Sequence, residues 1–533
     1  MRRRQAGRPG PGRHVVRGLS ARLLLAGAAG VAAAAAFPPY GLWWLVPPAV
    51  AALSLATRPG QGFRVGLVFG FAFMGVLLPW LTVIGTDAWL GLSLLEALFY
   101  GLLGWGLHRT SRLALWPIWH ACLWIAVEAL RGVVPWGGFN WGRLAFAMID
   151  GTVAPAVTYV GASGVTFLVA LSGSLLAWTV SRGAHRAAVV AAVGSLALLC
   201  VPTALPTWQP PDAPTTARIA VVQGNVPGEG MEAFAERRAV LDNHVEATLE
   251  LADRVARGEV EQPDLVLWPE NSTDIDPFRD PTVMRDISRA VDAIGVPTLV
   301  GAMIGGPGPI DVENQGIVWV PEVGPTTAYS KMHPVPFGEY IPMREFLAQY
   351  IERLDQIPRD MVPGDTIGRL DLGSTAIGDV ICFEVIYDGL IRDVVDAGAE
   401  LLVVQTNNAT YMGTGQVEQQ YAIARLRALE TRRVVAIAAT NGISAVVDPN
   451  GEAIERAPTR TQQVMLQTVP LLTELTPAVR FGALVEACLA GLGLLALAWS
   501  LARSRRRSRA EPIEGGSAPA EQPAGVLPTR GSA

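Results

Sequence analysis

Eight long apolar runs divide this sequence, and they constrain its fold more than any other feature. They fall at about residues 19–37, 41–57, 65–84, 88–108, 114–131, 153–181, 187–205 and 479–502. Each approaches the length of about 20 residues that an α-helix needs to cross a bilayer. Half of the 533 residues are apolar and only 17% are charged. We therefore predict a multi-span α-helical membrane domain, and a chain of this length requires at least one further structural unit.

The first two runs allow more than one interpretation, because they are short and are separated only by the turn-forming sequence PPYG. They form either two spans or one re-entrant hairpin. The AAAAAF end of the first run is also similar to a signal-peptide cleavage region. Six further spans follow, so stable insertion does not depend on cleavage.

The placement of arginine predicts the orientation of the spans. Positive charge favours the cytoplasmic side, and the arginine-rich N-terminus is followed by basic residues in alternate loops, whereas Arg131 and Arg143 depart from this pattern. The basic loop residues are Arg58, Arg64, Arg109, Arg112, Arg182 and Arg186. Seven crossings from a cytoplasmic start place the long region after residue 206 outside the membrane. The last span then returns the RSRRRSR tail to the cytoplasm, so both termini are expected there.

This pattern predicts six segments. They are a basic cytoplasmic N-terminus (1–18), a membrane domain of about seven helices (19–205), a proline-rich linker (206–216), an extracytoplasmic domain (217–475), a last transmembrane helix (479–502) and a cytoplasmic tail without apolar periodicity, expected to be disordered (503–533). Within 217–475, short apolar runs alternate with helix-like segments, as in DLVLWPEN, PTVMRDISRAVDAIG and PTLVGAMI. Such alternation predicts an α/β layer fold with functional groups where strands end.

Cysteine is rare, and one cysteine stands apart from the others. Cys122, Cys200 and Cys488 fall in apolar stretches, whereas Cys382 ends the strand-like run GDVIC in the water-soluble region. No CxxC or Cys/His spacing is present, so we predict neither a disulfide framework nor a metal site.

Three polar residues follow strand-like runs and together suggest a reaction. Glu270, Lys331 and Cys382 would each be unremarkable alone, as a solvated loop acid, an exposed lysine and a small core residue. Together they supply a base, an oxyanion-stabilising ammonium and a nucleophilic thiol, which is the equipment for acyl transfer. A Cys-His pair involving His333 is the alternative.

At these residues the sequence resembles the carbon-nitrogen hydrolase, or nitrilase, superfamily, whose Glu-Lys-Cys triad has this chain order. The blocks LVLWPEN, KMHPVPFGEYIP, GDVICFEVIY and RLRALETRRVVAIAATNGISAVVDPNG, set between seven helices and one, resemble the bacterial apolipoprotein N-acyltransferases. The resemblance implies a nitrilase-like α-β-β-α sandwich on the outer face of the bacterial cell membrane.

The resemblance also implies an activity. Cys382 would take an acyl chain from a membrane phospholipid as a thioester and pass it, in a ping-pong reaction, to the α-amino group of the diacylglyceryl-cysteine of an apolipoprotein. Glu270 would act as base and Lys331 would stabilise the tetrahedral intermediate, while Glu339 would orient Lys331 or the amine and Glu384 would support the nucleophile. No cofactor, no metal and no nucleic-acid partner are expected, and we expect a monomer.

Two loops depart from the family pattern. Where many relatives have TNDAWFG, this chain has TNNATYMGTG, so Tyr411 is expected to supply an aromatic contact. Where relatives often have tryptophan, the loop after VVQGNVPG offers only Met231 and Phe234. Tyr411 and Phe234 are therefore the candidate substrate-binding residues.

Other interpretations remain open. A membrane-anchored amidase of the same superfamily is the second candidate, and a transporter or a degenerate scaffold is the third. Glu128 and Arg131 have the spacing of a helical ion pair, and RLRALETRR is expected to be a charged helix face, with packing near the active-site cleft as the alternative. Because both proposed substrates have acyl chains, and moving each CH₂ into water costs about 0.8 kcal/mol, the spanning helices favour a lipid substrate.

Overall fold

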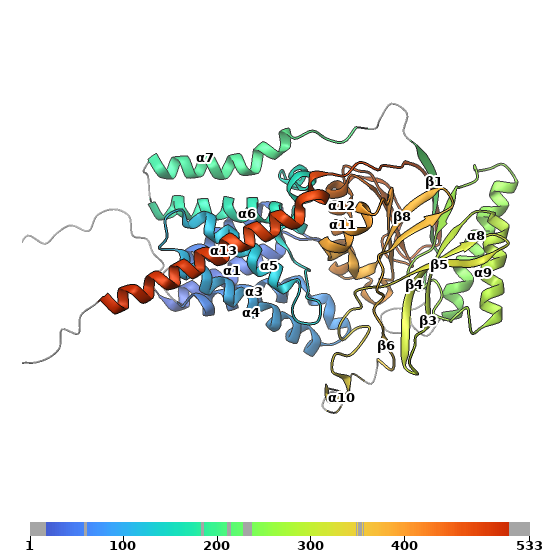
Figure 1. Cartoon of the computed structure of the whole chain (residues 1–533), viewed down its shortest axis with the longest axis horizontal. Helices are drawn as coiled ribbons and strands as arrows, with labels where there is room; N and C mark the ends of the chain where they lie inside the picture. The colour runs from blue at the N-terminus through green and yellow to red at the C-terminus, as the bar shows by residue number, and fades with distance from the viewer. Residues whose placement is uncertain are drawn as a thin grey trace, which may run out of the picture.

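The computed structural model describes residues 18–57, 61–182, 186–209, 215–226, 237–347, 349, 354 and 357–510. It consists of a bundle of apolar helices and a sandwich of two β-sheets, which lie side by side along the long axis of the molecule (Figure 1). Helices α11 (Asp388–Asp396) and α12 (Gly415–Thr431) lie between the two parts.

Each predicted apolar run contains a helix. The bundle is formed by α1 (Leu19–Ala35), α2 (Val46–Thr57), α3 (Gly62–Leu77), α4 (Thr86–Thr110), α5 (Trp116–Arg131), α6 (Val157–Arg182), α7 (Arg186–Cys200) and α13 (Pro477–Ala510). Within the described residues, four helical segments are long and apolar enough to cross a membrane, namely Thr86–Thr110, Ala154–Ser181, Arg186–Ala204 and Pro477–Arg506. The first two runs form separate short helices, α1 and α2, which pack against each other.

Small residues bring α3 and α4 into close contact. A Cβ added to Gly66 would lie 2.0 Å from the carbonyl oxygen of Tyr100, and one added to Gly104 would lie 2.3 Å from the carbonyl oxygen of Gly62. Helices in a lipid environment associate through such close backbone packing, because apolar side chains gain little by leaving lipid. Larger residues here would force the two helices apart.

The sandwich contains two mixed sheets. The first has the order β13-β1-β2-β3-β4-β5, with β6 beside β4, and the second has the order β12-β11-β10-β9-β8-β7. Their strands are β1 (Thr216–Gln223), β2 (Leu265–Leu267), β3 (Thr298–Gly305), β4 (Asp311–Val320), β5 (Gly324–Ser330), β6 (Asp360–Met361), β7 (Arg369–Leu372), β8 (Thr375–Ile381), β9 (Leu401–Thr406), β10 (Val434–Ala439), β11 (Ala445–Val447), β12 (Ala453–Arg456) and β13 (Gln463–Pro470). The central strands β1, β2 and β3 are parallel, as are β8, β9 and β10.

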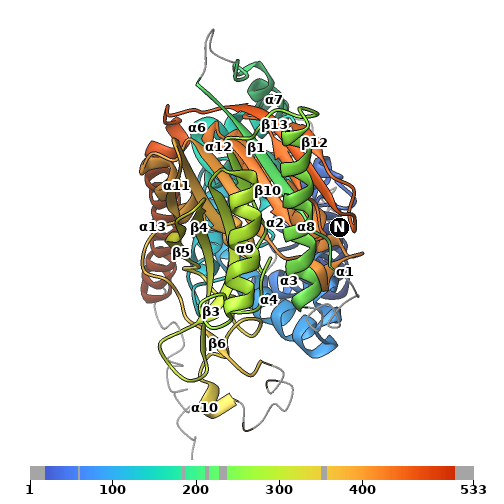
Figure 2. The same cartoon turned by 90° about the vertical axis from the view of Figure 1, so that its right-hand side faces the viewer.

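Helices cover both outer faces, so the predicted α-β-β-α sandwich is confirmed. Helices α8 (Arg237–Ala256) and α9 (Pro281–Ile294) lie side by side over the first sheet (Figure 2), and α11 and α12 cover the second. Apolar side chains fill the space between the sheets, including Ile219, Leu267, Ile381 and Val403. The short helix α10 (Arg344–Leu347) lies outside these layers.

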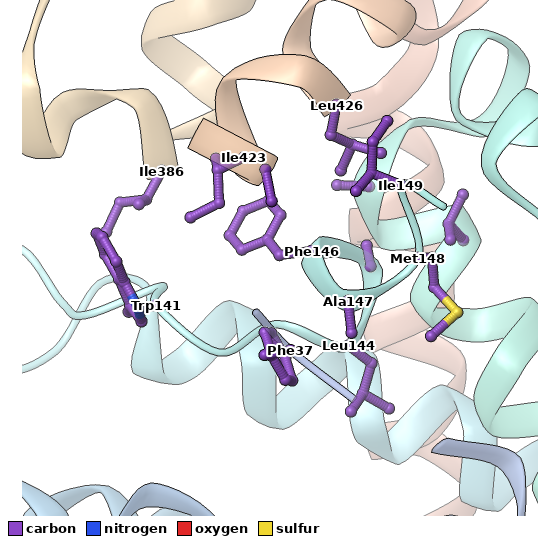
Figure 3. Close-up of a cluster of buried hydrophobic side chains, with 14 of the residues drawn as sticks. Phe37, Trp141, Leu144, Phe146, Ala147, Met148, Ile149, Ile386, Ile423 and Leu426 are labelled. Carbon is purple, nitrogen blue, oxygen red and sulfur yellow. The ribbon is translucent and has the colours of Figure 1, made fainter. Parts of the chain in front are cut away.

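One hydrophobic core runs from the bundle into the sandwich. Phe37, Trp141 and Phe146 of the bundle and its loops pack in the same cluster as Ile386 and Ile423 of the sandwich (Figure 3). Burial of these side chains contributes roughly 25 cal/mol per Å² of apolar surface removed from water. The segment that follows β8 is therefore packed directly against the helix bundle.

A buried ionic cluster lies at the same junction. Asp388, the first residue of α11, accepts hydrogen bonds from Arg143, which precedes α6, and from Arg427 of α12 at 2.7 Å. Burial alone would raise the pKa of Asp388, but Arg143 and Arg427 outweigh burial and hold the pKa below its usual range. Arg427 also donates to Glu430 at 2.6 Å, and Glu430 accepts from the backbone N–H of Ala162 in α6 at 3.2 Å. The cluster ties the sandwich to the bundle.

Two sequence-based expectations are wrong at this junction. Arg131 pairs with Glu96 of α4 at 2.7 Å instead of with Glu128, and Glu128 pairs with Arg143 at 3.4 Å. The RLRALETRR segment is not an exposed charged face, because Arg427 and Glu430 are buried. The alternative, packing near the site, agrees better with the hydrogen bonds of Arg427 to the carbonyl oxygens of Val385 and Ile386. Tertiary partners from distant segments decide these contacts, and local helical spacing does not reveal them.

We predict that Asp388→Asn destabilises the protein by about 3–5 kcal/mol, because it removes the buried carboxylate that Arg143 and Arg427 share and leaves their two positive charges only partly neutralised. Unfolding of the purified full chain in detergent, followed by tryptophan fluorescence, measures the change. Asp393→Asn is the matched control, since Asp393 lies on the same helix but is exposed. Equal stability of the two variants would contradict the role given to the ionic cluster.

Candidate active site

The three residues singled out in the sequence all follow strands. Glu270 follows β2, Lys331 comes directly after β5, and Cys382 comes directly after β8. Strands β2 and β5 belong to the first sheet and β8 to the second. The sandwich therefore brings three residues to one end of its strands, although Glu270 and Cys382 are 112 residues apart in the sequence.

The ammonium group of Lys331 is fully buried and contacts two carboxylates. Its Nζ lies 3.3 Å from Oε1 of Glu270 and donates to Oε1 of Glu339 at 2.7 Å. Burial acts to lower the pKa of Lys331, but the charges of Glu270 and Glu339 outweigh it and raise the pKa well above its usual value. Lys331 therefore holds a permanent positive charge in a site shielded from water.

Both carboxylates are held in place by further donors. Glu270 accepts a hydrogen bond from the side-chain amide of Asn314 at 2.7 Å and from the backbone N–H of Asn407 at 2.8 Å. Glu339 accepts from the backbone N–H of Val335 at 2.8 Å. Burial raises the pKa of Glu339, and Lys331 opposes that shift. These contacts fix the two acids around one ammonium group.

Cys382 lies in a turn and has a strained backbone conformation. Its φ of +54° lies in the left-handed region, which a residue with a side chain rarely adopts. A 3₁₀ segment, η8 (Cys382–Ile386), begins at this residue. The Thr406 hydroxyl donates to Sγ at 3.3 Å. The sharp change from strand to turn presents the sulfur at the end of the sheet.

Burial keeps the Cys382 thiol protonated at rest. It raises the pKa of Cys382 to about 12, with a further increase from the charge of Glu270 and a decrease from Lys331. The thiol therefore needs a base at the moment of reaction. Glu270 is the residue that the sequence predicts to be this base.

Glu384 braces the loop of Lys331 against the turn of Cys382. Its buried carboxylate accepts hydrogen bonds from the Tyr329 hydroxyl at 2.9 Å, from the backbone N–H groups of Met332 and His333 at 2.8 and 3.0 Å, and from Ile381 N–H at 2.8 Å. One side chain thus joins the residues after β5 to the end of β8. Removing it would leave several buried donors unpaired.

His333, the alternative partner of the cysteine, is engaged elsewhere. Its ring stacks on Tyr387 with centroids 4.1 Å apart, and Nδ1 lies 3.6 Å from the Glu384 carboxylate. The described part of the chain contains no group of three or more His, Cys, Asp or Glu side chains placed to hold a metal ion.

A row of aromatic side chains extends from the site to the helix bundle. The ring of Tyr411 packs edge-on against Trp80, with ring centroids 5.3 Å apart. The ring centroids of Trp80 and Trp141 are 5.5 Å apart, and Trp141 stacks on Phe383 with centroids 5.9 Å apart. Of these residues, sequence reasoning identified only Tyr411. The aromatic-rich block PWGGFNW was a usable signal for Trp141, whereas Trp80 lay inside an apolar run with no distinguishing neighbour. Phe234, the other candidate, lies outside the described residues.

A small cavity adjoins this aromatic row. Its volume is about 120 Å³, and it lies where α1, α3 and α12 meet. Pro38, Tyr40, Val76, Trp80 and Gln419 are among the residues that line it. The side chain of Gln419 fixes the surroundings, accepting from Trp141 Nε1 at 2.7 Å and donating to the carbonyl oxygens of Pro38 and Leu77 at 3.1 Å.

Comparison with known proteins identifies the relatives of this chain. Residues 29–175 match the family model described as apolipoprotein N-acyltransferase N-terminal domain, and residues 218–475 match the carbon-nitrogen hydrolase model. An apolipoprotein N-acyltransferase of Mycolicibacterium smegmatis is 38% identical over 88% of this chain and 84% of its own length. The chain belongs to the apolipoprotein N-acyltransferase family.

Other apolipoprotein N-acyltransferases are similar to this chain over nearly their whole length. The apolipoprotein N-acyltransferase of Azotobacter vinelandii is 30% identical over 92% of this chain and 96% of its own. A mutant of the Nesterenkonia AN1 amidase, from the nitrilase superfamily, is 16% identical with a TM-score of 0.36, covering 48% of this chain and 90% of that chain. Membership of the N-acyltransferase family rests on the full-length relatives and on the two family models.

The pKa of Cys382 leads to a test of its resting state. In a background with Cys122, Cys200 and Cys488 changed to serine, we expect alkylation by iodoacetamide to be slow at pH 7 and to accelerate about tenfold per pH unit, because only the thiolate reacts. Mass spectrometry of the modified chain gives the rate. A plateau between pH 7 and pH 9 would mean that the thiol ionises in that range, against a pKa of about 12.

Proposed function

We propose that the protein transfers an acyl chain from a membrane phospholipid to the α-amino group of the N-terminal diacylglyceryl-cysteine of apolipoproteins. The observation that carries the proposal is the Lys331 ammonium shared by Glu270 and Glu339, with the strained Cys382 turn within electrostatic reach. Membership of the N-acyltransferase family supports the same reaction. Each named residue then has a role that its position suits.

In the first half-reaction, Sγ of Cys382 attacks the ester carbonyl carbon of the phospholipid while Glu270 takes the thiol proton. The ammonium group of Lys331 stabilises the negative charge that develops on the carbonyl oxygen. The carbon–oxygen ester bond then breaks, and Glu270 returns the proton to the leaving alkoxide. A lysophospholipid leaves and the acyl chain remains on the enzyme as a thioester.

In the second half-reaction, the unprotonated α-amino group of the acceptor attacks the thioester carbonyl. Glu270 takes a proton from the attacking nitrogen, Lys331 again stabilises the oxyanion, and the carbon–sulfur bond breaks. The proton passes from Glu270 to the departing sulfur, which restores the thiol. Glu339, bonded to Lys331 at 2.7 Å, keeps the ammonium group oriented through both steps, and Glu384 holds the Cys382 turn.

The arrangement of the molecule suits substrates that stay in a bilayer. The aromatic row from Tyr411 through Trp80 to Trp141 connects the site with the helix bundle. An acyl chain lying along these rings would keep its CH₂ groups out of water, each worth about 0.8 kcal/mol. In this proposal Tyr411 contacts the acyl chain, and the loop of Phe234 contributes a second contact.

The same proposal includes the topology. The chain would cross the cell membrane several times, with the sandwich (217–475) outside the cytoplasm, the segments 19–205 and 479–502 in the membrane, and both termini in the cytoplasm, as a monomer. The alternation of basic loops supports this orientation. Only an extracytoplasmic sandwich would meet lipoprotein substrates after their export.

We expect incubation with phospholipid to add one acyl mass to Cys382. Intact-protein mass spectrometry should detect the adduct in the wild type and in the control Cys200→Ala, and its loss in Cys382→Ala, because the thioester bond needs that sulfur. Addition of a diacylated lipopeptide should then remove the adduct and yield the triacylated product. Lipopeptide conversion by Cys382→Ala would overturn the proposed nucleophile.

We expect Glu270→Gln to slow adduct formation by about 10²–10⁴-fold, the usual contribution of a general base. The amide retains the size of the side chain, so packing is preserved while the base and one of the two carboxylates that face Lys331 are removed. An amidase would instead release ammonia from a small amide and form no lysophospholipid. Detection of that activity without acyl transfer would favour the amidase.

A further inference from the structure

A second buried acid lies close to the catalytic groups and has no place in the reaction described above. Asp379 sits on β8, three residues before Cys382, and is fully buried. Its side chain points to the same face as Ile377 and Ile381, which belong to the apolar layer between the two sheets. An ionisable side chain in such a layer requires a partner.

A second buried acceptor, Oε1 of Gln405, lies beside Gly316 together with the carboxyl group of Asp379. Apart from a weak contact with the backbone N–H of Val380, neither carboxyl oxygen of Asp379 has a hydrogen-bond partner among the described residues, and Oε1 of Gln405 on the adjacent strand β9 has none. Both side chains lie close to Gly316 of β4. A Cβ added to Gly316 would lie 2.0 Å from Oδ2 of Asp379 and 2.6 Å from Oε1 of Gln405. Two acceptor oxygens that face the same small space in a dry interior repel each other unless one of them carries a proton, which could then be donated to the other.

The charges around Asp379 do not favour a carboxylate. The charged groups that act on it are the carboxylates of Glu384, on the turn after β8, and Glu270, on the loop after β2. Tyr329 of β5, whose own pKa rises through burial and neighbouring acids, also faces this region. Burial, reinforced by these acids, raises the pKa of Asp379 well above its usual value.

Gln405 connects this acid to the catalytic groups. Its Nε2 donates to the carbonyl oxygen of Trp268, two residues before Glu270, at 2.7 Å. The next two residues of the chain contact the site directly, because Thr406 donates to the sulfur of Cys382 at 3.3 Å and Asn407 N–H donates to Glu270 at 2.8 Å. A shift of Gln405 would therefore move both the nucleophile and the base.

We propose that Asp379 is a neutral carboxylic acid that donates its proton to Oε1 of Gln405, and that this hydrogen bond between β8 and β9 positions Cys382 relative to Glu270. Asp379 is then a positioning residue, and it touches no reacting atom. The glycine at 316 makes room for the pair, since any side chain there would strike both oxygens. The inference deepens the proposed acyl transfer and rests on it only for its effect on rate.

The protonation state has a stability test that does not depend on catalysis. The Asp379 carboxyl ionises near its ordinary pKa of about 3.9 in the unfolded chain but stays protonated in the folded one, so the folded state binds more protons and loses stability as pH rises. Asp379→Asn carries no such proton and can still donate to Gln405. We expect the stability of Asp379→Asn relative to wild type to increase steadily from about pH 5 to pH 9.

Asp371→Asn is the matched control, because Asp371 lies on β7 of the same sheet with its side chain 64% exposed. Its stability relative to wild type should not vary with pH over this range. Infrared difference spectra of wild type minus Asp379→Asn at pH 8 should show the carbonyl band of a protonated carboxyl group. A pH-independent stability difference together with a carboxylate band would overturn the neutral acid.

The positioning role is tested by the rate of acyl-adduct formation on Cys382 at saturating phospholipid. Asp379→Asn should keep most of the wild-type rate, whereas Asp379→Leu, which has similar size but no donor, should lose about 10²-fold, the effect of a displacement of about 1 Å at a reacting centre. Retention of the full rate by Asp379→Leu would overturn the positioning role.

A second variant covers the case in which Asp379→Leu does not fold. Gln405→Met removes the acceptor from the other side and should lower the rate in the same way, and a full rate in this variant would overturn the role equally. If the wild type itself forms no adduct, the proposed acyl transfer fails while the stability and infrared results still decide the state of Asp379.

Discussion

The buried ammonium group of Lys331 is the constraint on which the site depends. A lysine removed from water is stable in its charged form only if carboxylates replace the lost hydration. Glu270 and Glu339 do so from two different loops, at 3.3 and 2.7 Å. The need to neutralise one cation therefore brings together the end of β2, the end of β5 and the loop of residue 339. A charge fixed in this way needs no reorganisation when an oxyanion forms beside it.

The same principle joins the sandwich to the helix bundle. Arg427 is buried on α12 and is neutralised by Asp388 and Glu430, while its guanidinium also donates to the carbonyl oxygens of Val385 and Ile386 at 2.9 and 3.1 Å. Those two carbonyls belong to the 3₁₀ segment that begins at Cys382. Since Arg143 binds Asp388 from the bundle side, the turn of Cys382 is anchored to the helix bundle by charge as well as by the apolar contacts of Figure 3.

How much of this the sequence reveals depends on the range of each interaction. Hydropathy and the periodic spacing of apolar residues are local properties of the sequence. The apolar runs therefore predicted every helix of the bundle, and the alternating strand-like and helix-like segments predicted the layered sandwich. Chain order and strand ends suggested Glu270, Lys331 and Cys382. The pairing of Arg131 with Glu96 and of Arg143 with Asp388 spans 35 and 245 residues, and no local pattern encodes it. Trp80 and Asp379 escaped notice because each sits within an apolar run, where only the folded structure shows what it faces.

The high pKa of the Cys382 thiol suits the proposed two-step transfer, in which the enzyme waits first as a thiol and then as a thioester. The resting thiol and the acyl thioester are both uncharged, so both long-lived states leave the balance between Lys331 and its carboxylates unaltered. In the proposed mechanism, negative charge would appear near Lys331 only in the tetrahedral species of each half-reaction, which is where stabilisation accelerates the chemistry. A resting thiolate, by contrast, would form an ion pair with the ammonium group of Lys331 before any substrate arrived. The stabilisation that this ion pair provides would be lost when the thioester formed. Burial of the sulfur, which raises its pKa to about 12, would therefore keep the charge of Lys331 available for the transition states of the proposed reaction.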